Sequence, residues 1–497
     1  MHSCCWNRLF GQEGLDDLYQ RTGAPLNSAY ALPQLRVFYT NPNNTDTIKA
    51  VSKWTTLSAV CLSRWRGSPF TTVSYSEASW TGLFNFRRCV WDSEATSCLP
   101  PLCQSSLPDL NDFAFDNVVD TGKDKARCIF VNNNNNNNNN ETNSCNEGAS
   151  TNPYLDRWPE LQNCRFFLGL GDGACANIGS NCTSTSRIAV TIGTSAATRV
   201  VLPLAVENTK PATPFVVPKG LFCYRINATH ILMGGALTDG GSVFEWAQQL
   251  LNLHDDNASS DSSNTNSVGA LTTCLKEVLA LLEDDYSKMA GQGMDGIPKD
   301  TIVPFLSGER STGFRTGATF SAVGLTRDTT PARFLKSCLE GVVMRLAVII
   351  RCLREQIPAC TAITNKDDAD STNASNQQPD ILVSGGALEK NKIWRQMIAD
   401  CTGLCVHLDT TVTEATSRGV ALLISNAIQR QTDNDNSSNN NNDDDYGGSL
   451  VVDPILGDTE TSVPSESPGR MEYWRVASRK QEALIDAMDP LWSGTEN

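Results

Sequence analysis

Residues 187–195 read R-I-A-V-T-I-G-T-S, and this stretch is the strongest indication of the fold. Arg187–Ile192 is a short apolar run rich in β-branched residues, and a glycine follows it directly, a pattern typical of a buried strand that ends in a turn. A tight turn at Gly193-Thr194-Ser195 exposes backbone N–H groups beside the Thr194 hydroxyl, so it could hold a phosphate. A hairpin turn without a ligand is the alternative interpretation of the same residues.

Two other strand-like runs end in glycine turns. Asp380–Ser384 precedes Gly385-Gly386-Ala387, where two glycines let a flat ring or a ribose lie against the main chain. Phe166–Leu168 leads into Gly169–Ala174, G-L-G-D-G-A, which places the Asp172 carboxylate among small residues. That carboxylate could accept a proton from a substrate hydroxyl, or it could form only the local hydrogen bond of an ordinary Asx turn. No G-x-x-x-x-G-K-[ST] sequence occurs, which disfavours a P-loop nucleotide site.

A long helix is predicted at Pro331–Gln356. Thr329 or Thr330 can cap its start, and Pro358 lies just beyond its expected end. Its apolar residues recur every three or four positions and so form one core-facing stripe. Strands alternate with helices along this part of the chain, which indicates an α/β architecture.

The composition is that of an acidic globular protein. At roughly 100 to 200 residues per domain, 497 residues correspond to roughly two to four domains. Lys and Arg number 40 against 55 Asp and Glu, a net charge of −15, so neither a nucleic acid nor an anionic membrane surface is an expected partner. No apolar run approaches the roughly 20 residues of a membrane span.

The 18 cysteines are scattered along the chain, and its first residues do not resemble a secretory signal. We therefore predict reduced thiols and a cytoplasmic location. Cys401, Cys405 and His407 are close enough in sequence to suggest a metal site. No second ligand pair accompanies them, so small buried side chains are the favoured interpretation.

Four segments consist almost entirely of polar residues, mainly Asn, Asp and Ser: Asn132–Asn143, Asp255–Ser267, Lys366–Gln378 and Thr432–Tyr446. None carries enough apolar surface to offset the entropy lost on ordering, so each is predicted to be a polar insertion or linker that does not pack. After the last of them, Met471–Ile485 is predicted to form an amphipathic helix.

A series of motifs follows one another in a fixed order along the chain. They are T-G-A-P-L-N-S-A-Y at 22–30, S-E-A-S-W-T-G-L-F-N at 76–85, G-L-G-D-G-A-C-A-N-I-G-S at 169–180, R-I-A-V-T-I-G-T-S-A-A at 187–197, L-F-C-Y-R-I at 221–226, M-G-G-A-L-T-D-G-G at 233–241, P-F-L-S-G-E-R-S at 304–311, L-E-G-V-V-M-R-L at 339–346, S-G-G-A-L at 384–388 and E-A-T-S-R-G at 414–419. From about Leu18 to Ala427 this series resembles the FGGY family of carbohydrate kinases, and most closely its gluconokinase-like branch.

The resemblance implies a two-domain, actin-like (ribonuclease-H-like) ATPase fold with the active site in the cleft between the domains. Residues 1–186 would form the sugar-binding domain, 187–430 the nucleotide-binding domain, and 431–497 a polar linker and tail. The family opens with a D-x-G-T-T-[ST] hairpin that grips the phosphates. No such segment precedes Leu18, so the first domain is expected to be incomplete in this sequence.

The resemblance also implies a nucleotide site for ATP on the second domain. Gly193 and Thr194 match the family's loop around the phosphates. Gly241 falls where the family touches the nucleotide, and Gly385 with Gly386 matches its adenosine motif.

On the substrate side, Asp172 matches the family's catalytic base, which would also contact the substrate hydroxyl and help to hold Mg²⁺. Trp80 and Tyr30 lie in stretches that line the family's sugar pocket. For each of these two residues, stacking on a carbon chain and packing in the core are equally open interpretations.

The implied activity is ATP-dependent phosphorylation of a sugar or sugar acid, with D-gluconate favoured and xylulose, ribulose and glycerol as alternatives. The expected partner is therefore a small molecule, and a homo-oligomer is compatible with it. Two interpretations of the absent hairpin stay open: a kinase whose sequence is incomplete here, or a relative that keeps the cleft as a binding or regulatory module.

Several charged residues lie in apolar or glycine-rich parts of these motifs, where an unpaired charge would be costly. Buried ion pairs that fix the packing are the prediction for Glu309, Arg310, Glu340, Arg345, Glu414 and Arg418.

Overall fold

The structure is a computed structural model that describes residues 3–66, 72–113, 153–206, 215–253, 269–291, 298–364, 378–411, 414–436 and 459–493. The predicted insertions Asn132–Asn143 and Asp255–Ser267 lie outside the described residues, as do residues 366–377 and 437–446 of the other two.

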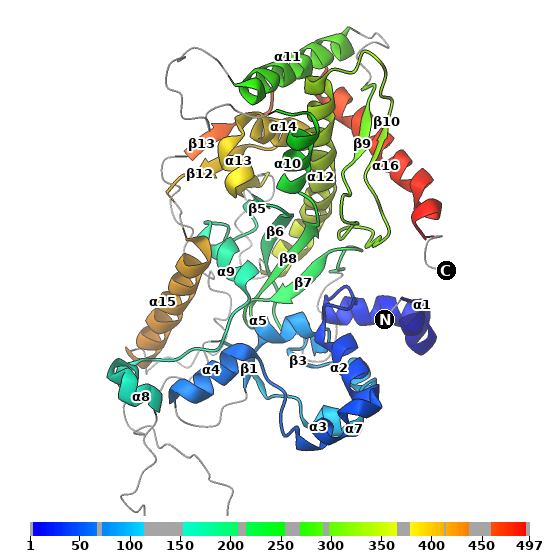
Figure 1. The fold of residues 1–497 in the computed structure, drawn as a ribbon. Helices are drawn as coiled ribbons and strands as arrows, with labels where there is room; N and C mark the ends of the chain where they lie inside the picture. Colours follow the sequence, from blue (N-terminus) through cyan, green and yellow to red (C-terminus); the bar gives the residue numbers. More distant parts are fainter. Residues whose placement is uncertain are drawn as a thin grey trace, which may run out of the picture.

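At the centre lies a seven-stranded mixed sheet with the strand order β13-β12-β11-β5-β6-β8-β7 (Figure 1). Both predicted strands are confirmed: β5 (Arg187–Ile192) and β11 (Asp380–Ser384) are direct parallel neighbours. β12 (Val406–Asp409) pairs in parallel with β11 on its other side. The remaining strands pair antiparallel, namely β6 (Ala196–Pro203), β7 (Phe222–Arg225), β8 (His230–Leu237) and β13 (Thr459–Ser462).

One face of the sheet packs against a layer of helices that contains the main hydrophobic core. Alternate residues of a strand point to the same face, so Ile188, Val190 and Ile192 are buried together against the apolar stripe of the long helix α12. The helices in this layer are α10 (Gly241–Leu250), α11 (Ala270–Ala290), α12 (Pro331–Thr364) and α14 (Lys392–Thr402).

The helix predicted at Pro331–Gln356 starts where expected but is longer, because α12 continues through Pro358 to Thr364. Proline removes one backbone donor, yet its fixed φ is close to that of a helix. The earlier turns are held by packing, with Leu339 and Leu346 fully buried, so the helix can continue past the proline. Neither α12 nor any other helix among the described residues is long and apolar enough to cross a membrane.

The opposite face of the sheet is covered by α9 (Asp172–Gly179) and α15 (Ala415–Asn436). Ile178 of α9, Leu423 of α15 and Leu232 of β8 belong to one buried cluster. Because α15 runs to Asn436, the first residues of the predicted polar segment Thr432–Tyr446 are helical. A helix that is already nucleated and packed can extend into polar residues at little cost.

The first part of the chain is mainly helical, and its described strands are only two residues long. Leu18, Leu32, Leu83 and Leu99 form a small core of its own. Its elements are α1 (Ser3–Thr22), α2 (Ala31–Thr40), α3 (Thr45–Ala50), α4 (Leu57–Arg66), β1 (Val73–Ser74), α5 (Tyr75–Ala78), β2 (Phe84–Asn85), β3 (Val90–Trp91), α6 (Ser93–Ser97), α7 (Pro101–Ser105), β4 (Leu110–Asn111) and α8 (Pro153–Arg157).

The end of the chain is built into the core of the second half. β13 forms one edge of the central sheet, and the helix predicted at Met471–Ile485 is confirmed as α16 (Arg470–Ser493). Tyr473 of α16 is completely buried, and its hydroxyl donates to the Glu340 carboxylate at 2.7 Å. The remaining elements are β9 (Thr301–Val303), which pairs with β10 (Ser321–Val323), and α13 (Gly386–Lys390).

The buried ion pairs predicted from the sequence are partly confirmed. Glu309 pairs with Arg345 at 2.8 Å, and Glu340 pairs with Lys336 at 2.7 Å. The prediction was wrong for Arg310 and Glu414, which are exposed and form no ion pair with any described residue. Water solvates these two charges, so they need no partner.

Arg418 was also predicted to lie in a buried ion pair, and this prediction was wrong as well. Its guanidinium donates to the carbonyl of Gly179 at 2.5 Å. That carbonyl lies at the C-terminal end of α9, where the last carbonyl groups of a helix lack partners and attract a cation.

A single buried guanidinium joins the first part of the chain to the central sheet. Arg225 of β7 is fully buried, and its backbone N–H donates to the Ser79 hydroxyl at 2.9 Å. Its side chain donates to backbone carbonyls on both sides of the junction, those of Phe86, Arg87, Leu204, Ala205 and Ala228.

Replacing this residue should therefore loosen the junction. We expect Arg225→Met to lower the free energy of unfolding by about 3 kcal/mol or more, because the buried carbonyls lose their donor. Urea unfolding followed by circular dichroism measures the change. Arg88→Met, at an exposed position, is the matched control and should change the value by less than about 0.5 kcal/mol. Equal effects of the two substitutions would contradict the role given to Arg225.

Candidate active site

The turns after β5, β8 and β11 meet at one edge of the central sheet. β11 is parallel to β5, and β8 also runs in the direction of β5 because β6 lies antiparallel between them. The three strands therefore end on the same side. Thr191 of β5 and Ser384 of β11 share a hydrogen bond between their hydroxyls at 2.9 Å, immediately before the two turns.

Close backbone contacts hold these turns together. The Gly241 N–H donates to the carbonyl of Gly193 at 2.8 Å, and the Gly240 N–H donates to that of Thr194 at 2.9 Å. A Cβ atom at Gly241 would lie 2.4 Å from the Gly193 oxygen. Gly385 has a φ of +95°, and a Cβ there would lie 2.4 Å from the Ile192 oxygen. Only glycine fits at positions 241 and 385.

Other parts of the same turns face open space. A Cβ atom added at Gly193 or at Gly386 would meet no atom within 4 Å. Gly193 and Thr194 are exposed, although they form the hairpin between β5 and β6. The structure therefore brings together the five positions predicted for a nucleotide, and it leaves the backbone of two of them accessible to a ligand.

Asp172 is the first residue of α9, and its side chain is exposed. One carboxylate oxygen accepts the N–H of the next residue, Gly173, at 2.6 Å, whereas the Ala174 N–H that an Asx turn would use donates to the Gly171 carbonyl. The other carboxylate oxygen accepts no hydrogen bond from a described residue. α9 is fixed against α15 at very short range: a Cβ at Gly419 would lie 1.8 Å from the Cys175 oxygen. This contact positions the helix that carries Asp172.

The loop before Asp172 is anchored on the first part of the chain. The Ser74 hydroxyl donates to the Gly169 carbonyl at 2.5 Å, and the Gly171 N–H donates to the Ser76 hydroxyl at 3.0 Å. Glu77 supports the same loop and accepts a hydrogen bond from Ser58 at 2.7 Å. Burial raises the pKa of the Glu77 carboxyl, against the effect of its hydroxyl partners. The loop therefore contacts both parts of the fold.

Arg199 is a cation beside Asp172 that the sequence-based predictions missed. It lies in β6, half-buried, and its Nε is 3.5 Å from where a Cβ on Gly173 would be. Burial lowers the pKa of its guanidinium, and the negative charge of Asp172 acts in the opposite direction. Its guanidinium donates no hydrogen bond to any residue that the structure describes. A charged residue inside the apolar run 196–202 was the signal that could have identified it.

The two predicted aromatic residues have different environments. Tyr30 is buried, and its hydroxyl shares a hydrogen bond with that of Tyr224 at 2.6 Å, which favours core packing for it. Trp80 is 46% exposed, and its ring stacks on Tyr224 with a centroid distance of 5.3 Å. Phe222 also stacks on Tyr224, with a centroid distance of 4.8 Å, and reaches Gly234 beside Arg199. A row of rings thus leads from the exposed Trp80 toward Arg199.

Of the segment with Cys401, Cys405 and His407, the first residue lies in α14 and the last in β12. The His407 Nδ1 shares a hydrogen bond with the Thr461 hydroxyl at 2.9 Å, across the pairing of β12 with β13. Within the part of the chain that the structure describes, no three His, Cys, Asp or Glu side chains are grouped so that they could hold a metal ion.

The adjacent glycines 385 and 386 allow a matched test of this geometry. We expect Gly385→Ala to lower the free energy of unfolding by about 2 kcal/mol, through its positive φ and the contact with Ile192. Gly386→Ala, which points into open space at the start of α13, should change it by less than about 1 kcal/mol. Urea unfolding of both variants measures the difference, and equal destabilisation would contradict the described turn.

Comparison with known proteins identifies the second half of the chain. Residues 188–428 match the C-terminal domain of the FGGY family of carbohydrate kinases. The chain is 25% identical over 388 residues to a gluconokinase of Bacillus licheniformis, and 26% identical over 385 residues to one of Bacillus subtilis (strain 168). Each alignment covers 77% of this chain but only 60% of the relative, less than two thirds of the relative's length.

Solved structures confirm the predicted fold. The gluconate kinase from Lactobacillus acidophilus superposes with a TM-score of 0.65 at 18% identity, covering 99% of this chain and 79% of that one. A ligand-bound xylulose kinase from the same organism gives 0.64, also at 18% identity and with the same coverage. The α/β architecture is therefore the actin-like, two-domain fold. Residues 188–428 are thus a C-terminal domain of the FGGY family of carbohydrate kinases, and the chain is similar to the two gluconokinases.

Proposed function

We propose that this protein transfers the terminal phosphoryl group of ATP to a hydroxyl of a sugar acid, with D-gluconate as the first candidate and 6-phosphogluconate as the product. The observation that carries the proposal is the convergence of Gly193, Gly241 and Gly385 at one sheet edge, with accessible backbone at Gly193 and Gly386. The alignment with two gluconokinases supports the same reaction class.

The nucleotide would lie on the second domain. The backbone N–H and the hydroxyl of Thr194 suit its phosphates, because oriented amides stabilise anionic oxygens, whereas the Gly193 N–H already donates to the Ser195 carbonyl at 2.9 Å. Gly241 lets the start of α10 pack against the Gly193 carbonyl, and the open space beside Gly386 leaves room for the adenosine. Bound ATP would supply the phosphoryl group, and the residues of the chain would supply orientation and electrostatic stabilisation.

Asp172 is suited to the role of general base. It is exposed and bound only to its neighbour's N–H, so one carboxylate oxygen is available to take the proton of the attacking hydroxyl. The same oxygen is of the type that Mg²⁺ prefers, and Asp172 would be the residue of this chain that helps to hold that ion. The fixed contact of α9 with α15 would keep the carboxylate in place during turnover.

Arg199 supports an acidic substrate rather than a neutral one. The Arg199 guanidinium is half-buried and has no hydrogen-bond acceptor among the described residues, so little further water has to be removed from it when a ligand binds. A carboxylate could accept two hydrogen bonds from it in bidentate geometry. The exposed face of Trp80 could pack against the carbon chain of the same substrate. Xylulose is the second candidate, because a xylulose kinase of Staphylococcus xylosus is 25% identical over 256 residues.

The role of Asp172 predicts a specific loss. We expect Asp172→Asn to lower kcat by roughly 10²- to 10⁴-fold, because the amide cannot accept the proton. The affinity for ATP should change by less than about threefold, since the phosphate turn lies on a different element. Steady-state assays and calorimetric titration with ATP measure the two quantities. Asp328→Asn, at an exposed site, is the control, and wild-type turnover of Asp172→Asn would contradict the assignment.

Substitution of Arg199 should affect the two candidate substrates differently. We expect Arg199→Met to raise KM for gluconate by roughly 10- to 100-fold, the effect of losing a charged hydrogen-bond pair, and to leave KM for xylulose unchanged. Arg199→Lys keeps the charge but not the fork and should fall between the two. Equal KM values for gluconate in all three proteins would contradict the carboxylate contact. A wild-type chain that phosphorylates none of the sugars or sugar acids tested would contradict the proposed function itself.

A further inference from the structure

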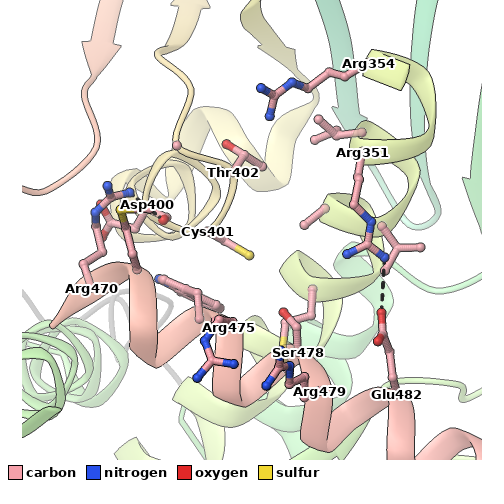
Figure 2. A pocket seen from close by; sticks show the side chains of 17 residues that line it. Arg351, Arg354, Asp400, Cys401, Thr402, Arg470, Arg475, Ser478, Arg479 and Glu482 are labelled. Atoms are coloured by element: carbon pink, nitrogen blue, oxygen red, sulfur yellow. Dashed lines mark hydrogen bonds and ion pairs between the residues drawn. The ribbon is translucent and has the colours of Figure 1, made fainter. Parts of the chain in front are cut away.

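A large cavity lies between α12, α14 and α16, and the candidate active site contributes nothing to it. Its volume is 480 Å³, within the range of roughly 300 to 1,000 Å³ that is typical of small-molecule pockets. None of the residues proposed to hold the nucleotide or the sugar lines it. Figure 2 shows its charged side chains around a central opening, with α12 on one side and α16 on the other.

Five arginines line this cavity, although the chain as a whole carries a net charge of −15. Arg351 and Arg354 come from α12, whereas the other three, Arg470, Arg475 and Arg479, come from α16 (Figure 2). A guanidinium stays protonated at any physiological pH, so these charges repel one another wherever no anion lies between them.

Two of the five are neutralised by carboxylates. Arg351 of α12 pairs with Glu482 of α16 at 3.3 Å at one side of the opening, and Arg475 donates to Glu472 at 2.6 Å (Figure 2). Asp400 also lines the cavity; burial raises the pKa of its carboxyl, whereas its hydrogen bonds and the charge of Arg470 act in the opposite direction. Its oxygens are already occupied by hydrogen bonds from Tyr286, Gln396 and the Ser465 N–H.

The other three form no ion pair with any described residue. Arg354 donates to the neutral amide of Gln378. Arg470 donates to the backbone carbonyl of Asp400 at 2.7 Å, and its Nε is buried without a partner among the described atoms. Arg479 is exposed and donates no hydrogen bond to a described residue. The cavity therefore holds an excess of guanidinium groups whose hydrogen-bonding capacity is unused.

We infer that this cavity binds a small organic anion that carries two or more phosphoryl or carboxylate groups. The unpaired arginines come from two helices on different sides, so one anionic group cannot serve all of them, whereas two groups joined by a short skeleton can. Guanidinium forks match both kinds of oxyanion in bidentate geometry. Met344, Ala347 and Val348 of α12 also line the space and would contact the carbon atoms of the ligand.

Inorganic pyrophosphate and citrate are suitable probes, because each carries several anionic groups and they differ in the kind. We expect calorimetric titration of the full chain to show binding of at least one probe. Arg354→Gln/Arg479→Gln should weaken that binding by at least about 30-fold, since two charged contacts are lost. Both residues lie outside ion pairs, so the variant should fold, which its unfolding midpoint can check. Arg327→Gln, at an exposed site elsewhere in the same domain, is the matched control and should bind as the wild type does.

Pyrophosphate can also occupy a nucleotide site, so a second measurement locates the binding. Phenylglyoxal modifies accessible arginines, and mass spectrometry reports the extent at each one. Bound probe should lower the modification of Arg354 and Arg479 at least about fivefold and leave Arg327 unchanged. Equal affinities of the double variant and the control, with unprotected Arg354 and Arg479, would overturn the inference. So would the absence of binding for both probes.

Discussion

The buried guanidinium of Arg225 is the constraint on which the relation between the two parts of the fold depends. Removing an arginine from water is costly, and the cost is met only where its donors find acceptors in fixed positions. Here the acceptors are main-chain carbonyls of residues 86–87 and 204–205. The guanidinium therefore holds the backbone of one part of the fold in a fixed position relative to the backbone of the other. A small shift of either part would leave a buried charge without acceptors.

The position of the candidate substrate region follows from this junction. The Arg225 N–H donates to Ser79, the residue before Trp80, and Tyr224 precedes Arg225 in β7. The stacking of Trp80 on Tyr224 therefore forms at the same place where the two parts are joined. Loop 169–171 crosses the junction nearby through Ser74 and Ser76 and leads directly into Asp172. Thus the groups proposed to bind the sugar acid are positioned by contacts that also hold the fold together.

Local sequence patterns predicted the elements of the nucleotide site but not all of its surroundings. β5 and β11 were predictable because a short apolar run ending in glycine is a local signal. The meeting of Gly193, Gly241 and Gly385 required knowledge of strand order, which the family resemblance implied and periodicity could not. Arg199 was missed because a charge within a strand has no meaning until its neighbours on the sheet face are known.

Arg310 and Arg418 also show that the role of a charged residue cannot be predicted without its tertiary neighbours. Both are charged residues in motif segments, and the general cost of burying a charge led to the prediction of ion pairs. Whether such a residue is buried at all, and whether a helix end rather than a carboxylate meets it, depends on tertiary packing. Similarly, the apolar stripe of α16 predicted a helix, but the residues that meet Tyr473 belong to α11 and α12, far away in the sequence.

Arg199 and the arginines of the cavity call for different ligands because their geometries differ. Arg199 is a single cation beside a carboxylate, which suits one anionic group attached to an uncharged chain. The cavity between α12, α14 and α16 has several cations on opposite sides and suits a ligand with several anionic groups. α13 and α14 connect the two places, since α13 follows Gly385 and α14 ends at the cavity. Trp394 of α14 is completely buried, and its indole N–H donates a hydrogen bond to the Leu339 carbonyl at 3.3 Å. The segment α13–α14 is therefore a rigid support and not a hinge.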